Sequence, residues 1–498
     1  MSTIEHQTLI AVAEDVNQGR SSALEIAEQH LERIERIDSK INAFVDVDRD
    51  QTLHSARAVD NAIAKGQRNL PLAGVPISIK DLIAVQNRPL RAGSKILGDY
   101  RPAHDATVVS KLKAAGAVII GKVSLDEFAM GSTNESASSG PVRNPWSLDS
   151  VPGGSSGGSA AAVSAKMGLA SLGTDTGGSV RLPAAFCGAV GVKPTYGRVS
   201  RSGVVAYASS LDQVGPITLN VRDAARLLSA IAGPCDHDST SVDQPIDDWA
   251  LACEQRIESM RFGVVVDWLE RLQPSVADAV NQAAQALCDA GAQRVDITLE
   301  HDHLAVPAYY VIAMSEASTN LARYDGVRYG RRAQLEAGAS LDQLYARSRA
   351  EGFGPEVRRR IILGTWALSS GYYDAYYDRA CRVRRLVRDE LTAALSHVDV
   401  LLGPTAPRTA WKIGDTQMDP LTTYQMDIFT TAANLAGLPA MSLPWGRDDQ
   451  GLPIGVQLHA GPWREANLFQ WGTALEAAAP SLEALPKSAR DLREINCD

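Results

Sequence analysis

The sequence predicts an α/β fold, and three observations support this prediction. Short apolar runs alternate with helical segments from Leu72 onward, which is the order of elements typical of α/β proteins. The chain has 498 residues, enough for about three average domains or one large one. Hydrophobic residues make up 45% of the chain and charged residues 21%, as in ordinary globular proteins, so disordered, collagen-like and disulfide-scaffold classes are excluded.

Residues 1–65 are expected to form a helical segment. Apolar residues recur at helical spacing from Leu9 to Ala13, and either Ser21 or Ser22 is expected to cap a second helix. A short apolar run at residues 41–45 is expected to form a strand before the next helix.

Strands and helices are expected to alternate between residues 72 and 220. A turn leads into a short extended run that ends at Lys80, and residues 107–116 fit a helix that is followed by a buried strand at residues 117–120. Residues 160–173 are rich in small side chains and are expected to form a further helix. This region is the expected catalytic core, because it also contains the glycine-rich segment of the chain.

Twelve of the 40 glycines lie between Pro152 and Gly203, and such clustering is typical of tight loops that approach a ligand closely. The sequence GGSSGG at residues 153–158 matches the GxSxG pattern of a nucleophile elbow, but no apolar strand precedes it, so that interpretation is disfavoured. A loop that leads into a helix at this point offers unpaired backbone N–H groups to an oxyanion.

An acidic, proline-containing connector is expected at residues 233–250. A second α/β stretch opens at Met260. The region from residue 260 to residue 498 is expected to complete the sheet and the substrate pocket.

Charge and residue spacing exclude several classes of protein. The chain has 49 basic and 58 acidic residues, a net charge of −9, which argues against binding nucleic acid through its overall field. No apolar run approaches the roughly 20 residues of a membrane span, and the first residues do not resemble a secretory signal, so a cytoplasmic protein is expected. The six cysteines and the pair His301 and His303 lack the spacing of metal ligands, so no metal site is expected.

Three polar residues stand in chain order in the expected core: Lys80, one of the serine pair Ser155 and Ser156, and Ser179. Together they resemble the catalytic set of the amidase signature family. The resemblance implies that Ser179 is the nucleophile, that Ser155 follows a cis peptide bond and relays a proton, and that Lys80 is the base. It also implies one large domain, residues 1–498, in which helices cover both faces of a mixed β-sheet.

The chemistry explains these residue types. A serine hydroxyl attacks a carboxamide poorly unless a base takes its proton, and no histidine lies near Ser179 in the sequence. Lys80 can act as that base if burial and positive neighbours lower its pKa. The alternative interpretation of Lys80 is a surface lysine at the end of a strand.

The residues before Ser179 are expected to stabilise the developing negative charge. Backbone N–H groups of Thr176, Gly177 and Gly178, with that of Ser179, are placed to form an oxyanion hole. The alternative interpretation of Ser179 is a helix cap. Its neighbours Asp175 and Arg181 are expected to support this loop rather than to take part in catalysis.

Further segments resemble the A, or glutaminase, subunits of glutamyl-tRNA(Gln) amidotransferases; they lie at residues 193–200, 210–216, 238–243, 309–330 and 351–377. The resemblance implies that Arg360 binds the α-carboxylate of glutamine, that Asp427 binds its ammonium group and that Tyr309 lines the pocket. Bidentate pairing suits arginine to a carboxylate. Arg358 and Arg359 remain alternatives, because a slip of one residue would move the role.

The same resemblance implies partners. Ammonia released from glutamine would pass through a channel to a B subunit, which with a C subunit completes a heterotrimer and amidates glutamate or aspartate carried on tRNA. The tRNA would bind mainly through the partner, where ATP and Mg²⁺ are also expected; no cofactor is expected in this chain. The choice between glutamine and asparagine, and between the two acceptors, stays open.

Leu182, residues 136–140 and His459 depart from the family pattern, which leaves fine substrate preference open. A stand-alone amidase is the main alternative function, and it would leave Arg360 and Asp427 without a purpose. A catalytically silent scaffold or RNA-binding protein is the third, and the presence of Lys80, Ser155 and Ser179 argues against it.

Overall fold

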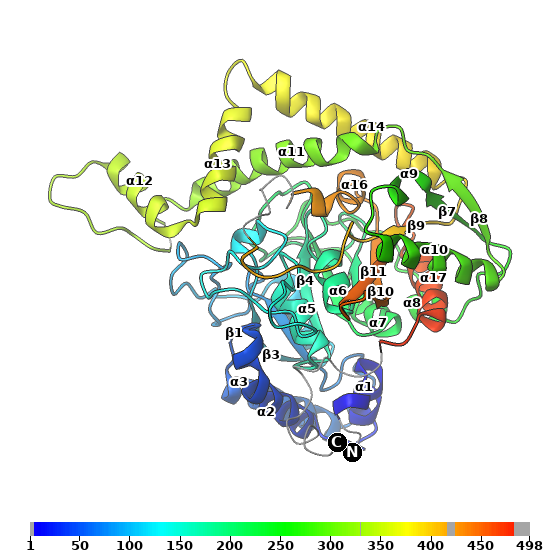
Figure 1. Cartoon of the computed structure of the whole chain (residues 1–498). Helices are drawn as coiled ribbons and strands as arrows, with labels where there is room; N and C mark the ends of the chain where they lie inside the picture. Colours follow the sequence, from blue (N-terminus) through cyan, green and yellow to red (C-terminus); the bar gives the residue numbers. More distant parts are fainter. Residues whose placement is uncertain (1–3, 329, 416–423, 483–498) are drawn as a thin grey trace.

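The centre of the molecule is one mixed β-sheet. The computed structural model describes residues 4–328, 330–415 and 424–482 (Figure 1). Within these residues eleven strands lie in the order β1-β3-β2-β4-β6-β5-β10-β11-β9-β7-β8. Their bounds are β1 (Phe44–Asp46), β2 (Pro76–Lys80), β3 (Val118–Val123), β4 (Ala170–Asp175), β5 (Val190–Lys193), β6 (Gln213–Thr218), β7 (Arg261–Val265), β8 (Gln293–Ile297), β9 (Val400–Pro404), β10 (Ala440–Arg447) and β11 (Pro453–Ala460).

The strands pair in both senses, as the prediction of a mixed sheet requires. β2 runs parallel to β3 and to β4, and β7 runs parallel to β8 and to β9. The other pairs are antiparallel. Because β2 lies between β3 and β4, the residue at its carboxyl end, Lys80, is enclosed by neighbouring strands on both sides.

Helices cover both faces of the sheet. Every residue of β2, β3, β4, β5, β6, β9 and β11 is buried, and since successive side chains point to opposite faces, neither face of these strands meets solvent. Helices that pack on strands are α2 (Ala23–Ile41), α3 (Arg49–Ala64), α5 (Gly157–Ser164), α6 (Arg181–Cys187), α7 (Val221–Ile231), α10 (Pro274–Asp289) and α17 (Glu465–Ala478). Shorter or peripheral helices are α1 (Leu9–Asn17), α4 (Thr107–Ala114), α8 (Trp249–Ala252) and α9 (Val266–Leu269).

A second group of helices lies above this body in Figure 1. It contains α11 (Ala305–Asn320), α12 (Leu341–Gly352), α13 (Pro355–Ala367), α14 (Arg379–Ala394) and α16 (Thr431–Ala436). α11 packs against α13, α14 and α16, whereas α12 extends away from the body. Single turns link these elements: η1 (Ile4–His6), η2 (Glu127–Ala129), η3 (Asp302–Leu304), η4 (Leu321–Arg323), η6 (Gln425–Asp427) and a short π-helix, η5 (Asp374–Asp378).

The amino-terminal helices and the first strand are confirmed. The cap of α2 is Ser22, whose hydroxyl accepts hydrogen bonds from the N–H groups of Leu24 and Glu25. Helix α4 and strand β3 occupy the predicted places, although β3 continues to Val123.

The prediction of a helix over residues 160–173 is wrong beyond Ser164. Helix α5 ends there, Lys166 adopts a positive φ of 54°, and residues 170–175 form β4. The small side chains that suggest a helix serve close packing instead: a Cβ added to Gly173 would lie 2.8 Å from Ser156 Oγ. Pairing with β2 and β6 overrides the local helix propensity.

No helix among the described residues is long and apolar enough to span a membrane. The five cysteines in the described part of the chain are all free, and Cys497 lies outside it.

Candidate active site

Lys80 lies at the carboxyl end of β2 and is completely buried. Its Nζ donates hydrogen bonds to Ser155 Oγ at 2.7 Å, Ser156 Oγ at 2.8 Å and Thr174 Oγ1 at 2.9 Å. The peptide bond between Gly154 and Ser155 is cis. The alternative of a surface lysine is therefore wrong, and two of the predicted catalytic residues are in direct contact.

Burial lowers the pKa of Lys80 to about 7. The expectation of positive neighbours is wrong, since the charges that act on this amine are the carboxylates of Asp126, Asp175 and Asp212, which raise its pKa. Loss of hydration outweighs their attraction because the amine lies wholly inside the protein. This shift favours the neutral amine of Lys80 far more than in a solvent-exposed lysine.

Ser156, the other member of the serine pair, contacts the amine of Lys80 from the amino-terminal end of α5. Its hydroxyl donates to Thr174 O at 3.2 Å and accepts from Thr174 N at 3.3 Å. Ser156 thereby ties the beginning of α5 to β4. The cis peptide bond precedes Ser155 and not Ser156. Thr174 has no motif of its own in the sequence and was not predicted.

Ser179 lies in the turn between β4 and α6. The residue at the helix cap position is Val180, and no side chain caps α6, so the interpretation of Ser179 as a cap is wrong. Its carbonyl accepts a hydrogen bond of 3.1 Å from Ser156 N, which holds this turn against the loop that contains Ser155. Within the described residues, no group is hydrogen-bonded to Ser179 Oγ, and the residue is 9% exposed.

The loop before Ser179 supplies fewer free N–H groups than predicted. Gly178 N donates to Asp175 Oδ1 at 2.8 Å, so its assignment to an oxyanion hole is wrong: the carboxylate already occupies that donor. In the described part of the chain, the N–H groups of Thr176, Gly177 and Ser179 have no hydrogen-bond acceptor. Glycine is required at Gly177 because the ring of Tyr309 lies where a side chain would stand.

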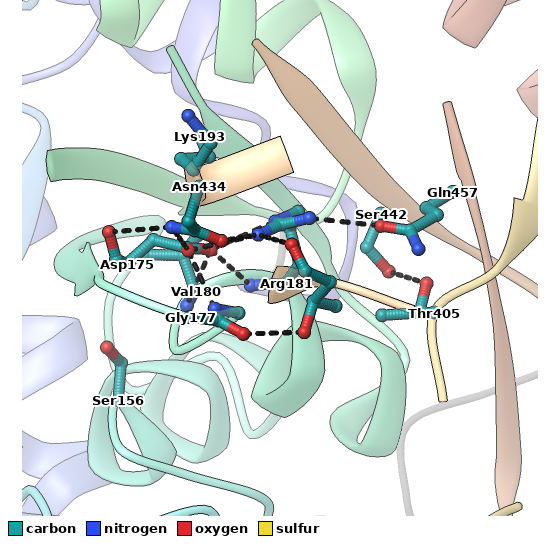
Figure 2. Close-up of polar contacts among 12 residues, drawn as sticks. Ser156, Asp175, Gly177, Val180, Arg181, Lys193, Thr405, Asn434, Ser442 and Gln457 are labelled. Carbon is teal, nitrogen blue, oxygen red and sulfur yellow. Dashed lines mark hydrogen bonds and ion pairs between the residues drawn. The ribbon is translucent and has the colours of Figure 1, made fainter. Parts of the chain in front are cut away.

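Asp175 and Arg181 form the buried support that the sequence predicts (Figure 2). Arg181 Nε and Nη2 reach Asp175 Oδ2 at 3.0 Å and Oδ1 at 3.1 Å, and neither side chain is exposed. Burial alone would raise the pKa of Asp175, but the guanidinium of Arg181 holds this pKa well below its usual range. Arg181 also donates to Asn434 Oδ1 at 2.7 Å and Gln457 Oε1 at 3.1 Å, which anchors the loop to α16 and β11.

Arg360 lies on α13 and is 3% exposed, whereas Arg358 and Arg359 face solvent. Arg360 Nε donates to Glu356 Oε1 at 2.8 Å, and Nη1 donates to Tyr207 OH at 2.7 Å. Three tyrosine rings surround the guanidinium carbon, at 5.8 Å for Tyr207 and 5.4 Å for both Tyr310 and Tyr424. Among the three arginines, only Arg360 is enclosed with the site.

Asp427 lies in η6 and is 7% exposed. Its carboxylate accepts hydrogen bonds from Tyr310 OH at 3.0 Å and from Ser132 Oγ at 3.1 Å. Burial raises the pKa of Asp427 to about 7. The structure therefore brings the predicted cation and the predicted anion to the same side chain, since Arg360 contacts the ring of Tyr310 and Asp427 accepts a hydrogen bond from its hydroxyl.

Tyr309 connects this pair to the serine loop. Its ring lies against Gly177 and 5.0 Å from the ring of Tyr310. Sequence reasoning missed Tyr207, Tyr310 and Asp212, although Tyr310 stands next to Tyr309 and Asp212 lies in a segment that carries the family resemblance. Each acts through contacts between distant parts of the chain, and no local pattern indicates such contacts.

Of the positions that depart from the family pattern, Leu182 and His459 are buried, whereas residues 136–140 are mostly exposed. Leu182 belongs to a small apolar cluster with Val151 and Phe186. The hydroxyl of Ser136 donates to Asp126 Oδ1 at 2.8 Å. His459 is fully buried, and neither of its ring nitrogens has a hydrogen-bond partner among the described residues; burial lowers its pKa to about 3.

Comparison with known proteins agrees with this geometry. The family model described as Amidase matches residues 25–469. The A subunit of glutamyl-tRNA(Gln) amidotransferase from Anaeromyxobacter sp. (strain K) is 51% identical over 94% of this chain and 95% of that protein. The crystal structure of the corresponding A subunit from Thermotoga maritima is 40% identical, covers 96% of both chains and superposes with a TM-score of 0.79. A peptide amidase from Stenotrophomonas maltophilia is 30% identical, with a TM-score of 0.81 over 96% of this chain and 99% of that one.

The buried lysine, the serine after a cis bond and the free serine hydroxyl therefore stand in a chain whose sequence and fold both match known amidases. The chain belongs to the amidase family, which also includes the A subunits of glutamyl-tRNA(Gln) amidotransferases.

Proposed function

We propose that this chain is the glutaminase subunit of a tRNA-dependent amidotransferase. The observation that supports this most strongly is the joint placement of a buried cation and a buried anion around Tyr310, next to the serine loop. Free glutamine carries one carboxylate and one ammonium group beside its carboxamide. An amidase for simple amides needs neither Arg360 nor Asp427.

In the proposed reaction, Arg360 binds the α-carboxylate and Asp427 binds the α-ammonium group. Arg360 Nη2 makes no hydrogen bond within the described residues and is available for a charge-assisted bond. The carboxamide then lies over Ser179, with its oxygen toward the N–H groups of Thr176, Gly177 and Ser179.

The neutral amine of Lys80 takes the proton of Ser155 while Ser155 takes the proton of Ser179. Ser179 Oγ bonds to the carboxamide carbon, and the loop N–H groups stabilise the oxyanion. The carbon–nitrogen bond breaks as the proton returns through Ser155 to the nitrogen, which leaves as ammonia. Water attacks the resulting ester with the same base, releasing glutamate and restoring Ser179.

In this proposal the ammonia passes to a B subunit of a heterotrimer that also contains a C subunit. ATP and Mg²⁺ act there, on an acidic amino acid carried by tRNA. The names of the relatives support this assembly, because they describe one subunit of an amidotransferase. The test measures ammonia release from glutamine by the purified chain, alone and with B and C subunits. We expect ATP and charged tRNA to raise the rate; hydrolysis of simple amides with no release from glutamine would identify a stand-alone amidase instead.

The substitution Arg360→Gln is expected to raise KM for glutamine about 10²-fold, because a buried charge-assisted contact with the carboxylate is lost. Steady-state ammonia release gives this value. Hydrolysis of an amide without an α-carboxylate is expected to change little. The matched control is Arg359→Gln on the exposed face of α13, which removes a surface ion pair with Glu356; an equal rise in KM for this control would contradict the assignment.

The value of kcat/KM for glutamine is expected to fall steeply below about pH 7. Lowering the pH protonates Lys80, which must be neutral, and Asp427, which must be ionised, and burial places the pKa of each near 7. The logarithm of kcat/KM therefore approaches a slope of two on the acid side. In the variant Asp427→Asn the slope is expected to drop to one; a slope that stays at two would show that Asp427 does not titrate in the site.

A further inference from the structure

One buried carboxylate joins the nucleophile loop to the segment that contacts Arg360. Asp212 Oδ1 accepts a hydrogen bond of 2.7 Å from Thr176 Oγ1. Its other oxygen, Oδ2, accepts from Tyr207 N at 3.0 Å and Ala208 N at 3.1 Å. Asp212 is 5% exposed, and within the described residues no basic side chain lies at ion-pair distance. This charge is held by hydrogen bonds from the two segments that it joins.

The connection continues to the predicted carboxylate site through Tyr207. The phenol of Tyr207 is 2% exposed and accepts a hydrogen bond of 2.7 Å from Arg360 Nη1. Hydrogen bonds therefore run from Thr176 to Asp212, through the backbone and ring of Tyr207, to Arg360.

A second set of contacts also connects the loop that carries Ser179 to the surroundings of Arg360. Tyr309 packs on Gly177, the residue after Thr176. Its ring also lies 5.0 Å from that of Tyr310, whose ring lies 5.4 Å from the guanidinium carbon of Arg360. The loop that carries Ser179 is thus connected to the surroundings of Arg360 both by a chain of hydrogen bonds and by the packing of aromatic rings. Buried networks of this kind couple the groups at their ends, because neither end moves without disturbing the other's hydrogen bonds.

We propose that Asp212 is a positioning residue that couples recognition of the substrate carboxylate at Arg360 to the geometry of the loop from Thr176 to Ser179. The inference rests on the proposed glutaminase function. A carboxylate on Arg360 fixes the guanidinium and Tyr207, and Asp212 transfers this constraint to Thr176. The free N–H groups of the loop then face the carboxamide oxygen. An amide without a carboxylate gains nothing from this coupling.

A double-mutant cycle tests the proposal with two variants that each remove one hydroxyl, Thr176→Val and Tyr207→Phe. Both leave the backbone contacts of Asp212 in place. We measure kcat and KM of the two single variants and the double variant in the same complex, with glutamine and with a short amide that lacks an α-carboxylate. For glutamine, the loss of kcat/KM in the double variant is expected to be smaller than the product of the single losses by at least about threefold. For the short amide, the losses are expected to multiply.

The control cycle pairs Tyr207→Phe with Thr405→Val. Thr405 is also fully buried and its hydroxyl contacts Ser442 at 2.8 Å, apart from the Asp175 cluster in Figure 2. The losses of Tyr207→Phe and Thr405→Val are expected to multiply with either substrate. If these two variants also showed coupling, the cause would be a general weakening of the fold.

Three results would overturn the inference. Losses that multiply for glutamine would show that Asp212 transmits nothing, while the glutaminase function stands. Equal coupling for both amides would show a merely structural role. If the wild-type complex releases no ammonia from glutamine, the proposed function fails and this inference fails with it.

Discussion

The substitution Lys80→Met is expected to lower kcat for glutamine hydrolysis about 10⁴-fold, because it removes the base that contacts the serine relay. Ser179→Ala is expected to have an effect of similar size. The residues act as a unit, so the double variant is expected to be no slower than either single variant. Ammonia release under saturating glutamine measures kcat, and thermal unfolding verifies that each variant is folded.

The serine pair provides the control for this prediction. Both hydroxyls contact Lys80, but the proposed proton relay uses only Ser155. We expect Ser155→Ala to approach the loss seen for Lys80→Met, and Ser156→Ala to cost about tenfold, the value of one buried hydrogen bond. A larger loss for Ser156→Ala than for Ser155→Ala would show that the relay runs through Ser156 instead.

The substitution Arg181→Met is expected to destabilise the protein by about 3–5 kcal/mol, because it leaves the carboxylate of Asp175 buried without its partner. The midpoint of urea unfolding measures this change. The double variant Asp175→Asn with Arg181→Met is expected to recover part of the loss, since no uncompensated charge remains.

An exposed ion pair serves as the comparison for Arg181. Arg385 and Asp389 lie one turn apart on α14, and both are largely exposed. Arg385→Met is expected to leave the unfolding midpoint unchanged, because solvent screens this pair. A loss for Arg181→Met no greater than that for Arg385→Met would show that the Asp175 carboxylate finds water or another donor in the folded protein.

The proposed catalytic set came from local patterns taken together with the resemblance to the amidase signature family. Lys80 ends a short apolar run, and Ser155 and Ser179 stand in glycine-rich turns. The roles of Arg360, Asp427 and Tyr309 were predicted from family resemblance. Among the three neighbouring arginines, only Arg360 is buried, whereas Arg358 and Arg359 are exposed.

What the sequence did not predict depends on contacts between distant segments. Pairing with β2 and β6 turned part of an expected helix into β4, and Asp175 occupied a donor assigned to the oxyanion hole. The charges around Lys80 also come from separate elements, so their sign could not be predicted from its neighbours in the chain. The contacts of Asp212 with Thr176 and of Tyr207 with Arg360 arise only in the folded molecule.

The proposed reacting groups and the groups that hold the ends of glutamine come from different halves of the chain. Lys80, Ser155 and Ser179 belong to the sheet and its loops, whereas Tyr309, Arg360 and Asp427 belong to the helical group and η6. Substitutions in the second half can therefore change which amide is held without disturbing the buried amine. Engineered variants that hold a different amide can therefore be sought by randomising positions on α11 and α13, the helices that carry Tyr309 and Arg360.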